Sequence, residues 1–215
     1  MNQSLVELMI PIVKGWGTEV AQKTAYLGVQ VHGGMGYIEE SGAAQYVRDA
    51  RITTIYEGTT GIQANDLIGR KIARDGGKAM FAVIEEMRGV HRKLADASSD
   101  DLAVVGMRLR NGVDALEDAT RWIVTHYADN PRVVLAGAGP FLELAGIVCG
   151  GAQLGRAALV AARKLIAADG DAGFLRAKIA TARHFAEHCL TYAPGLRDAA
   201  VEVAASVLAL AEDQF

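Results

Sequence analysis

Residues 30–63 of this chain read QVHGGMGYIEESGAAQYVRDARITTIYEGTTGIQ. The stretch places a glycine cluster, GGMG at residues 33–36, ahead of the carboxylate of Glu57, which Tyr56 and Gly58 flank. Glycine has no Cβ, so a cluster of glycines lets the backbone come close to a ligand. We therefore expect the cluster to border a cavity, with Glu57 in a dry pocket beside it.

The composition predicts an all-α protein. The chain has 215 residues, of which 51% are hydrophobic, with Ala and Leu more frequent than the β-branched residues. Only 4 prolines and 6% aromatic residues favour a helical bundle over a β-sandwich. No alternating β pattern persists for more than about five residues. The length allows one domain or two small ones.

Charge and termini exclude several classes of partner. A formal net charge of −3 leaves no basic footprint for nucleic acid or for an anionic membrane. The two cysteines, Cys149 and Cys189, are typical of a reduced cytosolic protein and not of a disulfide scaffold. The first residues, MNQSLVELMIP, lack the basic start and cleavage site of a signal peptide. We expect a cytoplasmic protein.

The most apolar run, LAGIVCGGAQLG at residues 144–155, predicts a buried helix. A membrane-spanning helix needs about 20 apolar residues, and this run is shorter and contains a glutamine. The spacings Gly146-x-x-x-Gly150 and Gly151-x-x-x-Gly155 therefore predict close contact between soluble helices, with no membrane span.

Helical periodicity divides the first 75 residues into three helices. The predicted ranges are 3–31 with a kink at Pro11, then 41–52 capped by Ser41, and 61–73 capped by Thr59 or Thr60. The glycine cluster is expected to end the first helix and to lie outside any other, because glycine disfavours helix interiors. The Asp75-Gly76-Gly77 segment predicts a boundary between residues 1–75 and residues 76–215.

Residues 76–215 predict an up-down bundle of four or five helices. Two apolar stripes at helical spacing come first, followed by predicted helices at 140–168, 173–192 and 194–212. The stripes are Met80, Ile84, Met87, His91 and Leu94, and Leu102, Val105, Leu109, Val113, Leu116 and Ile123.

The quoted stretch resembles the C-terminal helical domain of the acyl-CoA dehydrogenases. In that family a Gln-x-x-Gly-Gly-x-Gly-Tyr segment, here residues 30–37, precedes a Tyr-Glu-Gly-Thr segment, here residues 56–59. Residues 1–75 resemble the second half of this domain, and residues 76–215 resemble the extra helical domain of the large subgroup. The resemblance implies that the rest of the enzyme, including its middle β-domain, lies outside this chain.

The resemblance also implies roles for the second segment. Glu57 is implied to abstract the α-proton of an acyl-CoA while a hydride passes from the β-carbon to a flavin, and its backbone N–H to polarise the thioester carbonyl. Such a base must be desolvated and have its pKa raised to about 6–7. Gly58 is implied to line the substrate site, and Thr59, Thr60 and Gly61 to contact the flavin nucleotide. A helix-start glutamate that favours the helix dipole is the simpler alternative.

The first segment is implied to touch FAD. The family pattern places Gln30, Val31, His32, Gly33 and Gly34 against the adenine-dinucleotide part of an FAD held mainly by a neighbouring subunit. Glycine N–H groups can approach phosphate oxygens without a Cβ in the way. A Rossmann fingerprint is a poor alternative, because the full glycine spacing is absent and a helix precedes it. The same glycines must also form a helix C-cap and a turn.

Residues 184–188 read HFAEH, which matches the inverted zincin motif H-x-x-E-H. The match is short, and a third ligand should follow, whereas the remaining histidines lie far upstream. The flanking residues resemble the last helices of the large-subgroup extension. We therefore predict no metal ligand and keep a zinc hydrolase as an alternative.

The resemblance to the acyl-CoA dehydrogenases implies an FAD-dependent enzyme that oxidises acyl-CoA to trans-2-enoyl-CoA and passes electrons to an electron-transfer flavoprotein. We expect this fragment to carry the base and part of the flavin contact, to self-associate, and neither to retain FAD nor to turn over alone. A non-catalytic helical dimerisation or assembly module is the alternative function.

Overall fold

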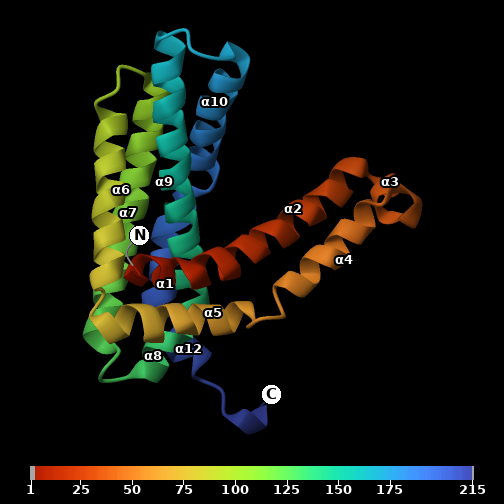
Figure 1. The fold of residues 1–215 in the computed structure, drawn as a ribbon. Helices are drawn as coiled ribbons and strands as arrows, with labels where there is room; N and C mark the ends of the chain where they lie inside the picture. Colours follow the sequence, from red (N-terminus) through yellow and green to blue (C-terminus); the bar gives the residue numbers. More distant parts are fainter. Residues whose placement is uncertain (1–2, 215) are drawn as a thin grey trace.

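The computed structural model describes residues 3–214, which form a helical bundle with a two-helix arm projecting from it (Figure 1). No strand occurs among these residues, which confirms the predicted all-α fold. The bundle contains α6 (Lys78–Ala95), α7 (Asp100–His126), α9 (Ala138–Ile166), α10 (Ala172–His188) and α11 (Ala193–Val201). The 3₁₀ turn η5 (Leu190–Tyr192) joins α10 to α11.

Both apolar stripes lie where the periodicity predicts. Met80, Ile84, Met87 and Leu94 on α6 are buried, and so are all six predicted residues of α7. His91 is only half-buried, and burial lowers its pKa below the usual value, with Arg88 adding to the effect. The core that these stripes form also includes residues of α1, α5 and α9. One hydrophobic core therefore joins the N-terminal helices to the bundle.

The central helix is α9, which packs against α6, α7, α10 and α11. Its length and hydropathy would suffice to cross a membrane, but 61% of its most apolar window is buried inside the bundle. The helix begins at Ala138, earlier than predicted, because only Gly137 interrupts the chain and Pro140 is tolerated in the first turn. The prediction of a buried helix is confirmed.

The glycines of α9 permit close contacts, as their spacing predicts. A Cβ on Gly146 would lie 2.1 Å from Cγ of Trp16, and one on Gly150 would lie 2.9 Å from the same indole. On the other face, a Cβ on Gly151 would lie 2.9 Å from the Leu190 side chain, and one on Gly155 2.9 Å from Leu94. A side chain at any of these positions would push α9 away from its neighbours.

The first predicted helix is three consecutive segments without a break. These are α1 (Gln3–Pro11), a π-helical turn η1 (Ile12–Trp16) and α2 (Gly17–His32). The π turn directly follows Pro11, whose missing N–H already removes one α-helical hydrogen bond. Periodicity predicts the extent of the helix but not this change of hydrogen-bonding pattern.

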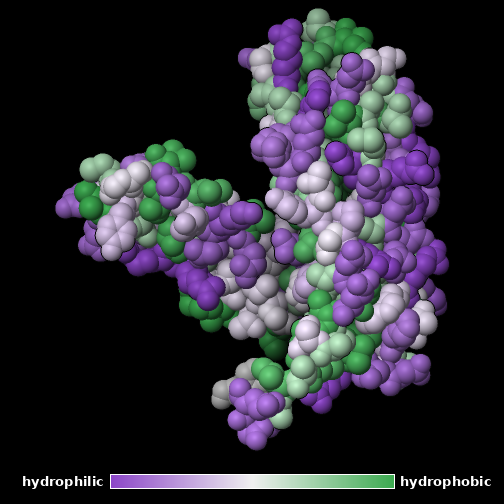
Figure 2. Space-filling view, turned by 180° about the vertical axis from the view of Figure 1, so that it is seen from behind, coloured by the Kyte–Doolittle hydropathy of each residue, from purple (hydrophilic) through white to green (hydrophobic). Residues whose placement is uncertain are grey.

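The arm consists of α2, the short α3 (Gly34–Tyr37), the 3₁₀ turn η2 (Glu39–Ser41) and α4 (Ala43–Thr53). Helices α2 and α4 pack against each other and away from the bundle, so α2 buries no residue of its own. Figure 2 shows hydrophobic surface at the tip of the arm and along its lower side. Large exposed side chains of the arm include Tyr26, Val31, Tyr37 and Tyr46.

Two details of the arm differ from the predictions. Gly33, with φ +61°, ends α2, but Gly34 and Gly36 lie inside α3, so the exclusion of the glycine cluster from helices is wrong. The cap of α4 is Gly42 in the left-handed region, not Ser41. The Ser41 hydroxyl still accepts a hydrogen bond from the Ala43 N–H at 3.2 Å, so it supports the same helix start.

The third helix begins as predicted. The Thr59 hydroxyl accepts from the Ile62 N–H at 3.3 Å and caps α5 (Thr60–Asp66). The helix continues as a π-helical turn η3 (Leu67–Ile72) and a 3₁₀ turn η4 (Ala73–Asp75). Gly76 and Gly77, with φ of +67° and +79°, then make the turn into α6.

The predicted helix 194–212 is wrong beyond Val201. Helix α11 ends there, and only the short α12 (Ala204–Val207) and the 3₁₀ turn η6 (Glu212–Gln214) follow. Neither segment has a buried residue, and a short helix without tertiary packing is marginal in water. Helix α8 (Pro131–Ala136), capped by the Asn130 side chain, lies beside α12 at the same end of the bundle.

A charge cluster joins α6 to α7 and predicts a pH-dependent stability. Arg88 binds Asp114 at 2.8 Å and also Glu117, which accepts a further hydrogen bond from Arg121 Nε at 3.2 Å. The hydrogen bonds from Arg88 and then Arg121 lower the pKa of Glu117 below its usual value. Its contribution to stability is therefore complete above the unfolded pKa of about 4.3 and is lost as the pH falls through the folded value.

We expect Glu117→Gln to lower the melting temperature at pH 7, because Arg88 loses a charged partner. The difference from the unmodified chain should narrow as the pH falls below about 4.3, where the unfolded chain takes up the proton before the folded protein does. Thermal unfolding followed by circular dichroism at pH 7, 5 and 3.5 checks this result. Glu85→Gln, which removes an exposed partner of Arg92, is the matched control, and its effect should be small at each pH. A difference in melting temperature between Glu117→Gln and the unmodified chain that stays constant with pH would contradict the role assigned to Glu117.

Candidate active site

Glu57 lies in the turn between α4 and α5, in a strained backbone conformation. Its φ is +54° and that of Gly58 is +90°, so two successive residues occupy the left-handed region. Such a conformation costs a residue with a side chain about 1–2 kcal/mol. A Cβ at position 58 would also lie 2.8 Å from Nε2 of Gln63, so the turn requires glycine there. Local structure therefore accounts for Gly58, whereas it disfavours a residue with a side chain at position 57.

Four hydrogen bonds hold this turn. Lys14 Nζ donates to the Gly58 carbonyl at 2.5 Å, and Gln63 Nε2 donates to the Glu57 carbonyl at 3.2 Å. The Thr60 N–H donates to the Thr54 carbonyl at 3.3 Å, and the Thr60 hydroxyl donates to Glu19 Oε1 at 2.5 Å. Both strained residues thus have their carbonyls bound by side chains from other parts of the sequence. Nothing in the local spacing around residue 57 could have identified Lys14 or Glu19.

The expected dry pocket around Glu57 is not formed by this chain alone. Glu57 is exposed, and the neighbouring Ile55 and Tyr56 are 47% and 51% exposed. These two side chains can shield the Glu57 carboxylate from water only if another surface covers them. The turn presents the carboxylate, and its desolvation requires further polypeptide or ligand.

The glycine cluster and Glu57 lie at opposite ends of α4. The cluster is at the tip of the arm, whereas Glu57 follows the other end of α4 near the bundle (Figure 1). Helix α4 has 11 residues, which corresponds to a length of about 16 Å. The expectation that the cluster and Glu57 border one cavity is therefore not met. Two open grooves on the arm, each of about 620 Å³, are lined by α2 and α4 and do not include Glu57.

The residues of the first segment have open surroundings. Val31 is 86% exposed, and His32 Nδ1 donates to the Gly28 carbonyl at 2.8 Å, which makes it a local hydrogen-bonding residue. Gly33 needs its positive φ, but Gly34 does not, and a Cβ on Gly34 would meet nothing within 4 Å. Neither backbone conformation nor packing within the described residues requires glycine at position 34. Gln30 is also exposed at this tip.

The hydroxyls after Glu57 are already engaged. Thr59 accepts from the Ile62 N–H, and Thr60 donates to Glu19. A threonine hydroxyl has one donor and two acceptor positions, so Thr59 can still donate and Thr60 can still accept. Gly61 is exposed, with only the Thr59 hydroxyl at 4.0 Å from the position of a Cβ. The three residues can contact a nucleotide through backbone and remaining hydroxyl positions.

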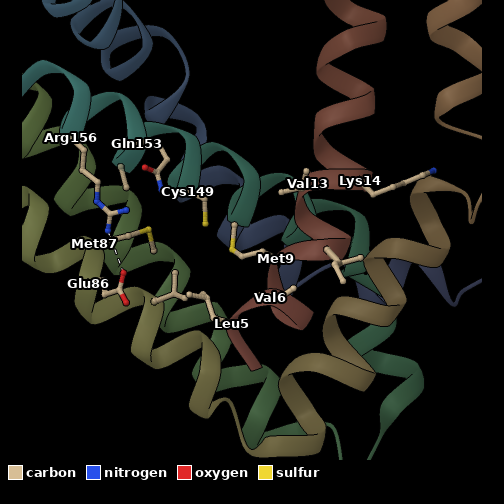
Figure 3. A pocket seen from close by; sticks show the side chains of 13 residues that line it. Leu5, Val6, Met9, Val13, Lys14, Glu86, Met87, Cys149, Gln153 and Arg156 are labelled. Carbon is tan, nitrogen blue, oxygen red and sulfur yellow. Dashed lines mark hydrogen bonds and ion pairs between the residues drawn. The ribbon is translucent and has the colours of Figure 1, made fainter. Parts of the chain in front are cut away.

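A separate apolar groove of about 680 Å³ lies between α1, α6 and α9 (Figure 3). Arg156 and Glu86 pair across its rim at 3.4 Å. Lys14 also lines it, but its ammonium points away from the other labelled side chains (Figure 3). The Cys149 thiol faces this groove, and burial raises its pKa to about 12, which leaves it protonated and unreactive near neutral pH.

The H-x-x-E-H motif forms no metal site among residues 3–214. The His184 and His188 rings stack at 4.2 Å, but no group of three or more potential His, Cys, Asp or Glu ligands gathers anywhere in this range. Burial also raises the pKa of the Cys189 thiol above its usual value, which disfavours a nucleophilic thiolate beside His188. The structure therefore offers no support for the zinc hydrolase alternative.

Comparisons with known proteins identify relatives of both parts of the chain. A family described as "Acyl-CoA dehydrogenase, C-terminal domain" matches residues 2–72, and one described as "Acetyl-CoA dehydrogenase C-terminal like" matches residues 81–211. The chain is 46% identical over 188 residues to 3-methylmercaptopropionyl-CoA dehydrogenase of Ruegeria pomeroyi, a match that covers 87% of this chain and 32% of the relative. It is 32% identical over 219 residues to a broad-specificity linear acyl-CoA dehydrogenase of Mycobacterium tuberculosis, covering 97% of this chain and 35% of the relative.

A shorter match, 50% identical over 46 residues, covers 21% of this chain and 11% of the human short-chain specific acyl-CoA dehydrogenase. The chain thus spans about a third of the length of the first two relatives. One family description matches the part of the chain that includes the arm, and the other matches the bundle. This chain therefore belongs to the acyl-CoA dehydrogenase family, as a C-terminal portion of such an enzyme.

Proposed function

We propose that this chain supplies the catalytic base of an FAD-dependent acyl-CoA dehydrogenase that oxidises acyl-CoA to trans-2-enoyl-CoA. The observation that carries the proposal is the Glu57 turn, in which an accessible carboxylate lies on a left-handed backbone held by hydrogen bonds with Lys14, Glu19 and Gln63. The names of the relatives support a coenzyme A thioester as the substrate class. On this proposal the chain is one part of a longer enzyme and is inactive alone.

The chain's own residues bind, orient and deprotonate the substrate in this proposal. Glu57 takes the proton from the carbon next to the thioester, and its backbone N–H polarises the thioester carbonyl. Gly58 leaves room for the thioester to lie against the backbone, because it has no Cβ. Closure over Ile55 and Tyr56 excludes water from the carboxylate, which raises its basicity.

FAD contacts come from two separate places in the proposal. Thr59, Thr60 and Gly61 lie beside the base and contact the nucleotide there, whereas the five residues 30–34 at the arm tip contact the adenine dinucleotide of a neighbouring subunit's FAD. Helix α4, about 16 Å long, separates the two sets. When bound, the flavin supplies the hydride acceptor.

Further assignments follow from the same proposal. Residues 1–75 act as part of the C-terminal helical domain and residues 76–215 as its helical extension. The exposed apolar side chains of the arm support a homo-oligomer, since surfaces of this kind mark interfaces. An electron-transfer flavoprotein is the proposed electron acceptor, and the cytoplasm the proposed location. The same exposed arm favours the alternative of a non-catalytic assembly module.

Flavin reduction by substrate separates these two functions. We expect the complete polypeptide that contains this chain to purify with bound flavin, and its visible absorption to bleach when an acyl-CoA is added without oxygen. The 215-residue chain alone should show neither property. A complete polypeptide without flavin, or with flavin that no acyl-CoA reduces, would favour the assembly module.

A further inference from the structure

Two side chains of one helical segment reach the Glu57 turn from far away in the sequence. Lys14, in the π-helical turn η1, donates to the Gly58 carbonyl at 2.5 Å across 44 residues. Glu19, five residues later, accepts from the Thr60 hydroxyl at 2.5 Å across 41 residues. The two contacts lie on either side of Thr59, so one helical segment holds the end of the turn that leads into α5.

Lys14 lies in the π turn, and Glu19 lies in the first turn of α2, which follows it directly. In an α-helix they would lie roughly 140° apart around the axis, because each turn takes 3.6 residues. A π turn closes its hydrogen bonds between residues i and i+5, so residues five apart come closer to one face. Single π turns within α-helices occur frequently at functional sites. Here the turn spans residues 12–16 and includes Lys14.

Gly15 lets this segment pack closely against α5 and α9. A Cβ on Gly15 would lie 2.7 Å from Leu142 Cδ2 on α9 and 3.1 Å from Gln63 Cβ on α5. Helix α5 is therefore held near η1, and Gln63 donates to the Glu57 carbonyl at 3.2 Å. The side chains of Lys14 and Gln63, which donate to the Gly58 and Glu57 carbonyls, are thus positioned by this close packing.

We propose that Lys14, supported by Glu19, is a positioning residue for Glu57. The claim rests on the proposed role of Glu57 as the base. Left-handed backbone at a residue with a side chain is unfavourable, so it persists only where surrounding contacts determine it. The bond from Lys14 is charge-assisted and therefore stronger than the neutral bonds in the same turn. Lys14 fixes the backbone from which the carboxylate projects and does not itself touch substrate.

Hydrogen exchange on the 215-residue chain tests the structural half of this claim without flavin or substrate. In Lys14→Met, which keeps the aliphatic stem, the amides of Thr60 and Gln63 should exchange about tenfold faster, because their bonds to Thr54 and Thr59 open more often. Lys14→Arg should restore most of the protection. Lys164→Met, which removes an exposed pair with Asp169, is the matched control and should leave the turn unchanged. Unchanged exchange at the turn in Lys14→Met would overturn the proposal.

Kinetics on the complete enzyme test the catalytic half. Misplacing a reacting group by about 1 Å can cost 10²-fold, so Lys14→Met should lower kcat by roughly 10- to 100-fold. KM should stay within about twofold, because the substrate contacts remain, and Lys14→Arg should recover most of kcat. If Glu57→Gln retains turnover, the proposed function fails. If Glu57 is essential but Lys14→Met turns over normally, the positioning role alone fails.

Discussion

Glu57→Gln removes acyl-CoA oxidation from the complete enzyme while leaving acyl-CoA binding in place. Glutamine keeps the size and polarity of the side chain but cannot accept the α-proton. A positioned general base contributes about 10²–10⁴-fold, so kcat should fall by about that factor. Rapid mixing with substrate in the absence of oxygen, followed through flavin absorption, measures the step in which the proton leaves. Binding is measured in parallel by calorimetry.

Glu85→Gln is the matched control for this experiment. Glu85 is an exposed carboxylate on α6 that pairs with Arg92, so the same chemical change should leave flavin reduction unaffected. Glu57→Asp should retain part of the rate, because a carboxylate remains but is withdrawn by one methylene. Rapid reduction by acyl-CoA in Glu57→Gln would remove this residue from the mechanism.

Gly146→Ala destabilises the bundle by about 2 kcal/mol. The added Cβ would lie 2.1, 2.4 and 2.5 Å from three ring atoms of Trp16, closer than any real contact. Overpacking of this kind typically costs about 1–3 kcal/mol, and the higher helix propensity of alanine returns at most about 1 kcal/mol. A loss of about 2 kcal/mol in a chain of this size lowers the melting temperature by about 4–8 °C. Thermal unfolding followed by circular dichroism measures it.

Gly139→Ala provides the control in the same helix. A Cβ there would meet nothing within 4 Å, so alanine should leave the melting temperature unchanged or raise it. A double variant gives a sharper test, because Trp16→Ala removes the atoms that Gly146→Ala would strike. The two substitutions should therefore cost less together than the sum of their separate costs. Additive losses, or no loss in Gly146→Ala, would show that Trp16 does not lie against α9 as described.

The bundle could be predicted well because its signals are local. The stripes on α6 and α7 repeat at the spacing of one helical face, and Thr59 caps the helix that begins at the next residue. The glycine spacings of α9 predicted close contact, although not its partners. Gly146 meets Trp16, which is 130 residues earlier by number (146 − 16), and no local pattern encodes such a pairing.

The errors occur where packing, or its absence, outweighs local propensity. The glycines at positions 34 and 36 are poor helix formers, yet they lie in α3, where Gly36 packs against α2. A Cβ on Gly36 would lie 2.3 Å from the Val29 carbonyl oxygen, so close packing requires glycine there. Residues 202–214 include good helix formers, but none of them is buried, and the helix ends.

Local signals were enough to predict the helical class, the buried faces of α6 and α7, and the burial of α9. These follow from periodicity and from short-range turn chemistry, which act within a few residues. The separation of the glycine cluster from Glu57 by α4, and the contacts of Lys14 and Glu19 with the turn, emerge only from the folded arrangement of the helices. Hydrogen bonds that span more than 40 residues depend on how the helices pack, and packing is a property of the whole chain.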